Sequence, residues 1–329
     1  MNSVITFSPA FTIVPTYECF NRCSYCNFRL DPGMGELLTR SQITEIISKL
    51  DKSRVAEILI LSGEVHPASS KRIDWFTKLQ EACEISLTSG FLPHTNAGPL
   101  SRQEMKLLKE ANVSMGLMLE QADPRFMNTV HKHAPSKQPK LRSQQIEQAG
   151  ELKIPFTTGI LLGIGESDRD ITESLEEIAR IHDRWGHIQE VILQPHSVGT
   201  QQQLNFPSFD PHKLSGIISQ ARDILPSEVA IQIPPNLVPE TNFLLQCLDA
   251  GATDLGGISP IDEVNPDYPH PTPESLSAIL EPAGWQLKAR LPVYPQYYDW
   301  LSPKLKKAIE RKKKSLIWKN QDFYKKLML

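Results

Sequence analysis

The chain has 329 residues, of which 40% are hydrophobic and 22% charged, with a net charge of −3 and a mean hydropathy of −0.30. This composition is typical of a soluble globular protein with a large core. No apolar run is long enough to span a bilayer and no secretion signal is present, so we expect a cytoplasmic protein without disulfides.

Short apolar runs alternate with longer runs of helical periodicity along the chain. The expected strands cover residues 11–16, 56–64, 84–90, 113–120, 155–166, 190–196, 229–236 and 253–259. The expected helices cover residues 39–50, 72–83, 101–112, 140–153, 170–186, 211–225, 241–251 and 272–284. Thr39 or Ser41 is expected to cap the first helix. In the helix at 170–186, one face is apolar and consists of Ile171, Leu175, Ile178 and Ile181.

Eight strand–helix units in one chain favour an α/β fold, a (β/α)₈ TIM-type barrel, over an open doubly wound sheet. Runs such as 58–61 and 191–193 are continuously apolar, as in strands that are buried on both faces. An incomplete barrel of six strands with a C-terminal extension is the alternative. In a barrel the active site lies at the C-terminal ends of the strands, so we expect functional residues there.

The charge separates the barrel, expected over residues 1–300, from a basic tail at 301–329. From Lys304 onward ten Lys or Arg oppose two acidic residues, a balance of +8, whereas residues 1–303 carry 25 basic and 36 acidic groups, a balance of −11. Such a tail can bind nucleic acid or an acidic partner. No aromatic-rich RNA-binding motif accompanies it, so we expect a helix that folds back on the acidic body and no nucleic-acid or membrane partner.

Three of the five cysteines, Cys19, Cys23 and Cys26, lie within eight positions directly after the first expected strand. Thiolates bind soft metals and iron–sulfur clusters. A [4Fe–4S] cluster normally has four cysteine ligands, so three would leave one iron open for another molecule. The alternative is a zinc site, which needs a fourth ligand; the nearest histidine, His66, lies far along the chain.

The C-x-x-x-C-x-aromatic-C spacing after the first strand of an α/β barrel resembles that of the radical S-adenosylmethionine (SAM) enzymes. In that family three thiolates hold a [4Fe–4S] cluster whose open iron chelates SAM. One electron then yields a 5'-deoxyadenosyl radical, which abstracts hydrogen from the substrate. The resemblance implies that Cys19, Cys23 and Cys26 are the cluster ligands and that Tyr25 lies close to the adenine.

Two later strand ends also resemble elements of this family. The stretch at 62–64 is similar to a G-G-E element that contacts the SAM amino group, with serine in place of the first glycine. The stretch at 159–166 is similar to a G-x-I-x-G-x-x-E element whose glycines allow the backbone to approach adenine and ribose closely. The resemblance implies a SAM site lined by Ser62, Gly63, Glu64, Gly159, Leu161 and Gly163.

Polar residues and glycines at other strand ends are further candidates. Glu120 ends the fourth strand, and Gln194 and His196 end the sixth. His196 could transfer a proton there, since histidine is the side chain that ordinarily changes charge near neutrality. Candidates for substrate contact near the eighth strand are Asp254, Gly256, Gly257 and Asn265. Asp254 begins that strand, so the two glycines are closer to the active end.

Within the radical SAM enzymes, stretches such as "ITFSPAFTIVPTYECFNRCSYCNFR" and "GATDLGGISPIDEVNPD" resemble the first subunits of 7,8-didemethyl-8-hydroxy-5-deazariboflavin (FO) synthase. His270 stands where a tryptophan is expected. The resemblance implies biosynthesis of the deazaflavin precursor of coenzyme F-420. It also implies a partner, a second FO synthase subunit that is itself a radical SAM enzyme, and an electron donor that the sequence does not identify.

In that family the partner joins a 4-hydroxybenzyl group to 5-amino-6-(D-ribitylamino)uracil. The subunit resembled here abstracts hydrogen from this adduct, 5-amino-5-(4-hydroxybenzyl)-6-(D-ribitylimino)-5,6-dihydrouracil, and closes the central ring with loss of ammonia, a lyase reaction. Two alternatives stay open. One is another radical SAM enzyme, of the menaquinone pathway or similar to tyrosine lyase, and the other is a non-catalytic zinc or iron–sulfur protein.

Overall fold

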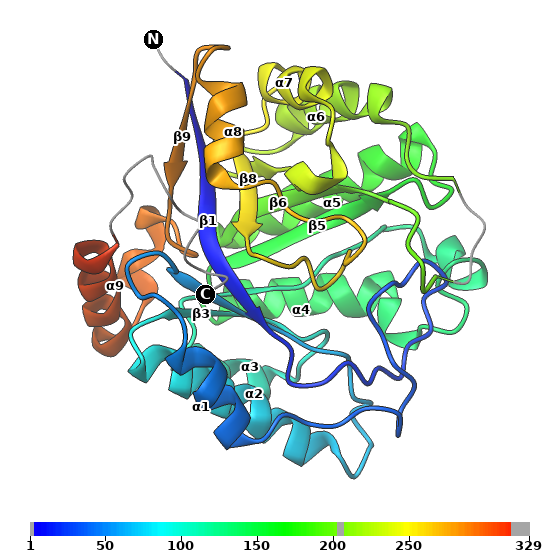
Figure 1. Ribbon diagram of the computed structural model, residues 1–329. Coiled ribbons are helices and arrows are strands. Elements are labelled where there is room, and N and C mark those ends of the chain that lie inside the picture. The colour runs from blue at the N-terminus through cyan, green and yellow to red at the C-terminus, as the bar shows by residue number, and fades with distance from the viewer. Residues whose placement is uncertain (1–2, 203–206, 317–329) are drawn as a thin grey trace.

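The computed structural model describes residues 3–202 and 207–316. Within them a parallel sheet is surrounded by helices (Figure 1). The strand order is β2-β3-β4-β5-β6-β7-β8-β1, and β1 also pairs with β2, so the sheet closes on itself. The expected (β/α)₈ barrel is confirmed. The six-stranded alternative is wrong, because β7 and β8 complete the ring.

The strands are β1 (Ser3–Ile13), β2 (Glu57–Leu61), β3 (Leu92–Asn96), β4 (Ser114–Gly116), β5 (Phe156–Leu162), β6 (Ile188–Pro195), β7 (Ala230–Gln232), β8 (Asp254–Ile258) and β9 (Trp285–Ala289). The α-helices are α1 (Arg40–Ser48), α2 (Arg72–Thr88), α3 (Arg102–Lys109), α4 (Pro139–Glu151), α5 (Asp168–Trp185), α6 (Leu214–Ile224), α7 (Thr241–Asp249), α8 (Pro273–Leu280) and α9 (Pro303–Ser315). A short 3₁₀ helix, η2 (Pro135–Lys137), precedes α4.

The barrel closes on β1, which is longer than the sequence predicts. At Thr6 it pairs with Asp254 of β8 and with Lys288 of β9. Further along, residues 10–13 pair with residues 57–60 of β2. The sequence predicted only residues 11–16 as strand and did not predict β9, which covers the N-terminal half of β1. The loop with the three cysteines therefore leaves from the C-terminal end of a strand that is anchored along its length.

The predicted third strand, residues 84–90, is wrong. Residues 84–88 belong to α2, in which Ile85 and Leu87 are buried by helical packing that overrides their strand propensity. The true third strand is "LPHTN", which contains a proline, a histidine and an asparagine. Its pattern is polar because part of it faces a cavity inside the barrel. The apolar pattern by which a strand is recognised in a sequence is therefore missing.

The helix predictions at 39–50 and 170–186 are confirmed in detail. Thr39 caps α1 in a reciprocal capping box with Gln42. In α5 all four predicted apolar residues are buried against the sheet. In the described part of the basic tail, α9 buries Leu305 and Ile309, and Lys312 donates hydrogen bonds to the carbonyls of Lys52 and Val55. The rest of that tail, residues 317–329, lies outside the described residues.

No helix among residues 3–202 and 207–316 is long and apolar enough to cross a membrane.

The floor of the barrel is a buried ionic cluster around Arg290, which follows β9. Its guanidinium donates two hydrogen bonds to Asp254, at 2.6 and 2.7 Å, and a third to Glu190. Tyr294 Oη donates to the same two carboxylates at 3.2 Å. Burial raises the pKa of Glu190, although the nearby Arg290 lowers it. Each buried charge here is stabilised by its partner, so loss of one leaves the others uncompensated.

We predict that Arg290→Met lowers the free energy of unfolding by about 3–5 kcal/mol, because two carboxylates then lack their cation in the interior. Unpaired buried carboxylates have pKa values above those of the unfolded chain, so the destabilisation is largest at high pH and shrinks as pH falls. Anaerobic unfolding at pH 8 and pH 6 measures it. The control is Arg169→Met, which removes an exposed pair with Glu173. An equal loss at both pH values would contradict the prediction.

Candidate active site

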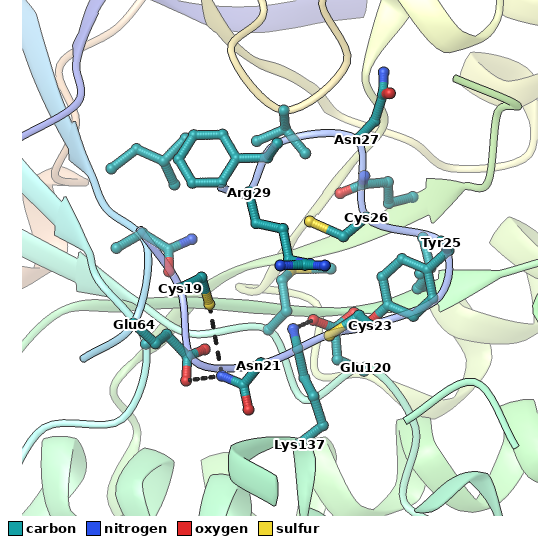
Figure 2. Close-up of a pocket in the computed structure, with 18 of the residues that line it drawn as sticks. Cys19, Asn21, Cys23, Tyr25, Cys26, Asn27, Arg29, Glu64, Glu120 and Lys137 are labelled. Atoms are coloured by element: carbon teal, nitrogen blue, oxygen red, sulfur yellow. Dashed lines mark hydrogen bonds and ion pairs between the residues drawn. The ribbon is translucent and has the colours of Figure 1, made fainter. Parts of the chain in front are cut away.

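The three cysteines lie together at the C-terminal end of the barrel. Cys19, Cys23 and Cys26 all line one cavity of about 310 Å³ (Figure 2). All three thiols are free and half-buried. The structure therefore brings together the residues that the sequence predicted as cluster ligands, around a space that could hold a cluster.

Backbone hydrogen bonds hold the cysteine loop in place. Cys19 N donates to Leu30 O at 3.0 Å, and Cys26 N donates to Cys23 O at 3.1 Å in a tight turn. The amides of Arg22 and Ser24 donate to the carbonyls of His133 and Val130. The loop therefore keeps its shape through contacts with the segment that follows β4, rather than through the cysteines alone.

The thiols have the donor chemistry that a soft metal cluster requires. Burial raises the pKa of Cys23 to about 12, and burial together with Glu64 raises the pKa of Cys19. A coordinated metal supplies the positive charge that makes such thiols ionise. Three thiolates and an open cavity fit an iron–sulfur cluster with one free iron.

The structure does not support the zinc alternative with His66. That side chain lines a different cavity, where its ring packs on Phe20 with centroids 5.1 Å apart. Among the residues that the structure describes, no three His, Cys, Asp or Glu side chains are close enough to hold a single metal ion. A four-iron cluster is larger than one ion, so its ligands stand further apart.

The end of β2 packs directly against the cysteine loop. A Cβ on Gly63 would lie 2.2 Å from the carbonyl oxygen of Glu18, so only glycine fits. Gly63 N also donates to Thr16 O at 2.9 Å. The hydroxyl of Ser62 accepts a hydrogen bond from the indole of Trp75 at 2.9 Å. Serine is therefore accommodated in place of the expected glycine.

Glu64 is held by polar side chains from three segments. Its carboxylate accepts hydrogen bonds from Arg142 at 3.0 Å, from Asn21 at 2.8 Å and from Ser136. Gly98 makes room for it, since a Cβ there would lie 2.3 Å from the Glu64 side chain. The acid is therefore fixed at the edge of the cavity, beside Cys19 (Figure 2).

Glu120 is the second acid of the site and has an unusual backbone. Its φ of 69° is in the left-handed region, which costs free energy in a non-glycine residue. Its side chain is ion-paired with Lys137 and lies 3.9 Å from Arg142. Burial alone would raise the pKa of Glu120, but these two cations lower it. The carboxylate is thus held ionised at the wall of the cavity.

Tyr25 and Leu161 belong to one small apolar cluster at the cavity, together with Phe126, Val130 and Ile164. The hydroxyl of Tyr25 is 3.0 Å from Nε2 of His131. Tyr25 and Leu161 therefore give the cavity a partly apolar wall beside the cysteines. It is suited to stack against an aromatic ring such as adenine.

Gly159 of β5 and Gly163, which directly follows that strand, have other roles. Neither Gly159 nor Gly163 is part of the cavity wall. A Cβ on Gly159 would lie 2.2 Å from the carbonyl oxygen of Ile192, so this glycine allows β5 and β6 to approach. Gly163 has a φ of 92° and turns the chain after β5. Its amide donates a hydrogen bond to the Glu166 carboxylate at 2.5 Å. The motif shapes the strand end that carries Leu161.

The weaker candidates lie at different depths of the barrel. His196 lines the cysteine cavity, and Gln194 and Asn265 line both that cavity and a second, lower one. Gly257 lines only the lower cavity. Asp254 is at the opposite end of the barrel, bonded to Arg290, and lines neither. Gly256 has a φ of 74° and packs against Gln232.

Sequence reasoning missed Arg142 and Lys137, which join the two acids of the site. Arg142 is 1% exposed although it lies on α4, where the sequence indicates an ordinary amphipathic helix. Lys137 is in η2, and its ammonium contacts Glu120 at the wall of the cavity (Figure 2). The only sequence signal was the short stretch "HKHAPSKQP" between strand and helix.

Comparison with known proteins agrees with this geometry. Residues 13–178 match the model of the Radical SAM superfamily. A 7,8-didemethyl-8-hydroxy-5-deazariboflavin synthase from Trichormus variabilis is 61% identical over 308 residues, 94% of this chain and 91% of the relative. The chain belongs to the 7,8-didemethyl-8-hydroxy-5-deazariboflavin synthase family of radical SAM enzymes.

Other members and more distant structures agree. Synthases of this family from Nostoc sp. and Thermosynechococcus vestitus are 59% and 58% identical, over 96% and 93% of this chain and 94% and 97% of the relatives. The FeFe-hydrogenase maturase HydG from Carboxydothermus hydrogenoformans superposes with a TM-score of 0.72 at 16% identity, covering 95% of this chain and 77% of its own. Methylornithine synthase (PylB) gives 0.67 at 18%, covering 87% and 84%. These two structures support the fold alone.

We predict that the triple variant Cys19/Cys23/Cys26→Ala loses the cluster, because no other thiol among the described residues lines the cavity. Anaerobic reconstitution should load about four irons per wild-type chain and almost none in the variant. Iron and sulfide analysis with electron paramagnetic resonance measures this. Cys83→Ala, in the core beside Thr95, is the control and should load normally. Zinc at one per wild-type chain, without iron, would contradict the assignment.

Proposed function

We propose that this chain catalyses the ring-closing step of deazaflavin biosynthesis and forms 7,8-didemethyl-8-hydroxy-5-deazariboflavin. The observation that carries the proposal is the 61% identity to a synthase of that name over 94% of the chain. The arrangement of three thiols, two fixed carboxylates and an open barrel cavity supports it. The substrate proposed is the hydroxybenzyl–ribityl–uracil adduct, which loses ammonia as the ring closes.

Cys19, Cys23 and Cys26 would hold a [4Fe–4S] cluster. When bound, the cluster supplies the electron that cleaves SAM into methionine and the 5'-deoxyadenosyl radical that abstracts hydrogen. The chain itself orients the reactants and excludes water from them. These tasks fall to the side chains around the cluster loop.

Each wall residue can be given a role from its contacts. Glu64 would accept a hydrogen bond from the SAM amino group, because its carboxylate is fixed beside Cys19. Lys137 would attract the SAM carboxylate, since it is a buried cation near Cys23. The apolar wall at Tyr25 and Leu161 would take the adenine. His196, with Nδ1 buried and without a partner in the described structure, is our candidate for proton transfer in the substrate part of the cavity.

We also propose a cytoplasmic location, a second radical SAM subunit that supplies the adduct, and a separate electron donor. Another radical SAM activity, as in menaquinone-pathway or tyrosine-cleaving enzymes, is the competing function. Both share the cluster chemistry, so only the product distinguishes them.

We predict that Glu64→Gln weakens SAM binding by about tenfold to a hundredfold, because a hydrogen bond to a charged group is lost. Equilibrium dialysis with the reconstituted protein measures the dissociation constant. Iron content should stay at the wild-type level, since Glu64 is not a cluster ligand. Glu84→Gln, on the exposed face of α2, is the control. If Glu64→Gln bound SAM as tightly as the wild type, Glu64 would not be part of the SAM site.

We predict that the anaerobic wild-type protein forms a fluorescent deazaflavin when it is mixed with SAM, a reductant, the partner enzyme, 5-amino-6-(D-ribitylamino)uracil and tyrosine, the source of the 4-hydroxybenzyl group. Chromatography with fluorescence detection measures the product. Omission of this chain is the control. If SAM is cleaved but no deazaflavin appears, the proposed reaction is wrong and another radical SAM activity is indicated.

A further inference from the structure

The inside of the barrel below the cysteine cavity is hollow. TIM barrels usually fill this space with layers of Val, Ile and Leu side chains. Here a lower cavity of about 160 Å³ occupies it. The residues that line both cavities, and so mark where they adjoin, are Leu59, Leu61, Asn96, Ile192, Gln194, Val264 and Asn265.

The walls of the lower cavity are polar because successive strands turn polar side chains inward. Glu57 comes from β2, His94 from β3, Thr157 from β5 and Glu190 from β6. Burial raises the pKa of Glu57, and Thr157 donates a hydrogen bond to Glu190 at 2.8 Å. Arg290 closes the floor. A barrel whose stability alone mattered would have apolar residues at these positions, so their polarity indicates a ligand.

Three amide side chains in this cavity make no hydrogen bond with the described part of the chain. They are Asn96 at the end of β3, Gln194 on β6 and Gln232 on β7. Gly256 makes room for Gln232, since a Cβ there would lie 2.2 Å from its Nε2. An amide can donate two hydrogen bonds and accept two, and unpaired polar groups inside a protein cost free energy. These amides are therefore available for a polar ligand.

We propose that the lower cavity binds the polyhydroxylated ribityl chain of the substrate, and that Asn96, Gln194 and Gln232 determine specificity for it. The inference rests on the proposed function. Each hydroxyl group of such a chain both donates and accepts hydrogen bonds, so the chain can donate to the carboxylates and bond with the amide groups at the same time. A flat aromatic ring offers no such set of hydrogen bonds. The ring system of the adduct then lies in the upper cavity, beside the three cysteines.

His270 is part of this cavity and bears on the same specificity. It stands where the family resemblance leads us to expect tryptophan. The structure places it in the lower wall, with Nδ1 buried and without a partner in the described residues. A polar ring here adds a further group that can bond to a hydroxyl.

The test compares two small probes, 5-amino-6-(D-ribitylamino)uracil and 5-amino-6-(pentylamino)uracil, which differ only in the hydroxyl groups. Calorimetry with the anaerobic, cluster-loaded protein should show at least about tenfold tighter binding of the ribityl probe, because a site built for hydroxyls rejects an analogue that lacks them. Gln232→Leu and Asn96→Leu should each reduce this preference severalfold. Gln286→Leu, an exposed strand glutamine on β9, is the matched control and should keep it.

Equal affinity of the wild type for both probes would overturn the inference. So would a preference that both leucine variants retain. Thermal unfolding and iron content identify a misfolded variant, and the two variants lie on different strands, so one can serve if the other does not fold. If the wild type prefers the ribityl probe and these variants reduce that preference, the inference is supported, whatever the coupled assay shows. If the coupled assay gives no deazaflavin, the proposed function alone is overturned.

Discussion

The active site depends on one buried guanidinium, that of Arg142. Its Nη2 donates to Glu64, its Nη1 to the carbonyl of Met118 and its Nε to the carbonyl of Ser136. A charge that is 1% exposed is stable only where such partners surround it. Arg142 therefore fixes the ends of β2 and β4 and the start of α4 relative to one another.

The strained backbone of Glu120 follows from the same arrangement. Its amide donates to Gly159 O, and its carbonyl accepts from Leu161 N, so the residue is tied to β5 on both sides. The left-handed φ then directs its carboxylate toward Lys137 and Arg142. Such a strained backbone is kept only where many surrounding contacts hold it in place, and this is common at functional sites.

Closure of the barrel connects this site to the polar interior. The cysteine loop begins where β1 ends, and β1 is held by β8, β9 and β2 together. Because the ring is complete, the inward residues of β2, β3, β6 and β7 face one another below the cysteines. One end of the barrel thus holds three thiols around one cavity, and its interior holds side-chain amides that make no hydrogen bond with the described part of the chain.

Much of this could be predicted where the local pattern is strong. The caps and the apolar face of α5 are encoded within a few residues, and so is the spacing of Cys19, Cys23 and Cys26. The third strand could not be predicted, because its inward side chains are polar and its neighbour α2 contains residues with strand propensity. β9 pairs with residues almost the whole chain length away, so no local sequence pattern predicts it.

The amino-acid order alone was sufficient for the alternation of strands and helices, the grouping of three thiols and the likeness to radical SAM enzymes, because these are properties of neighbouring residues. The folded chain was needed to select Arg142 and Lys137 from many similar cations, and to separate Asp254 on the floor from Gln194, which lines both cavities. It also distinguished the glycines that shape β5 from those that line a cavity. These distinctions rest on contacts between segments far apart in sequence, which exist only once the barrel has closed.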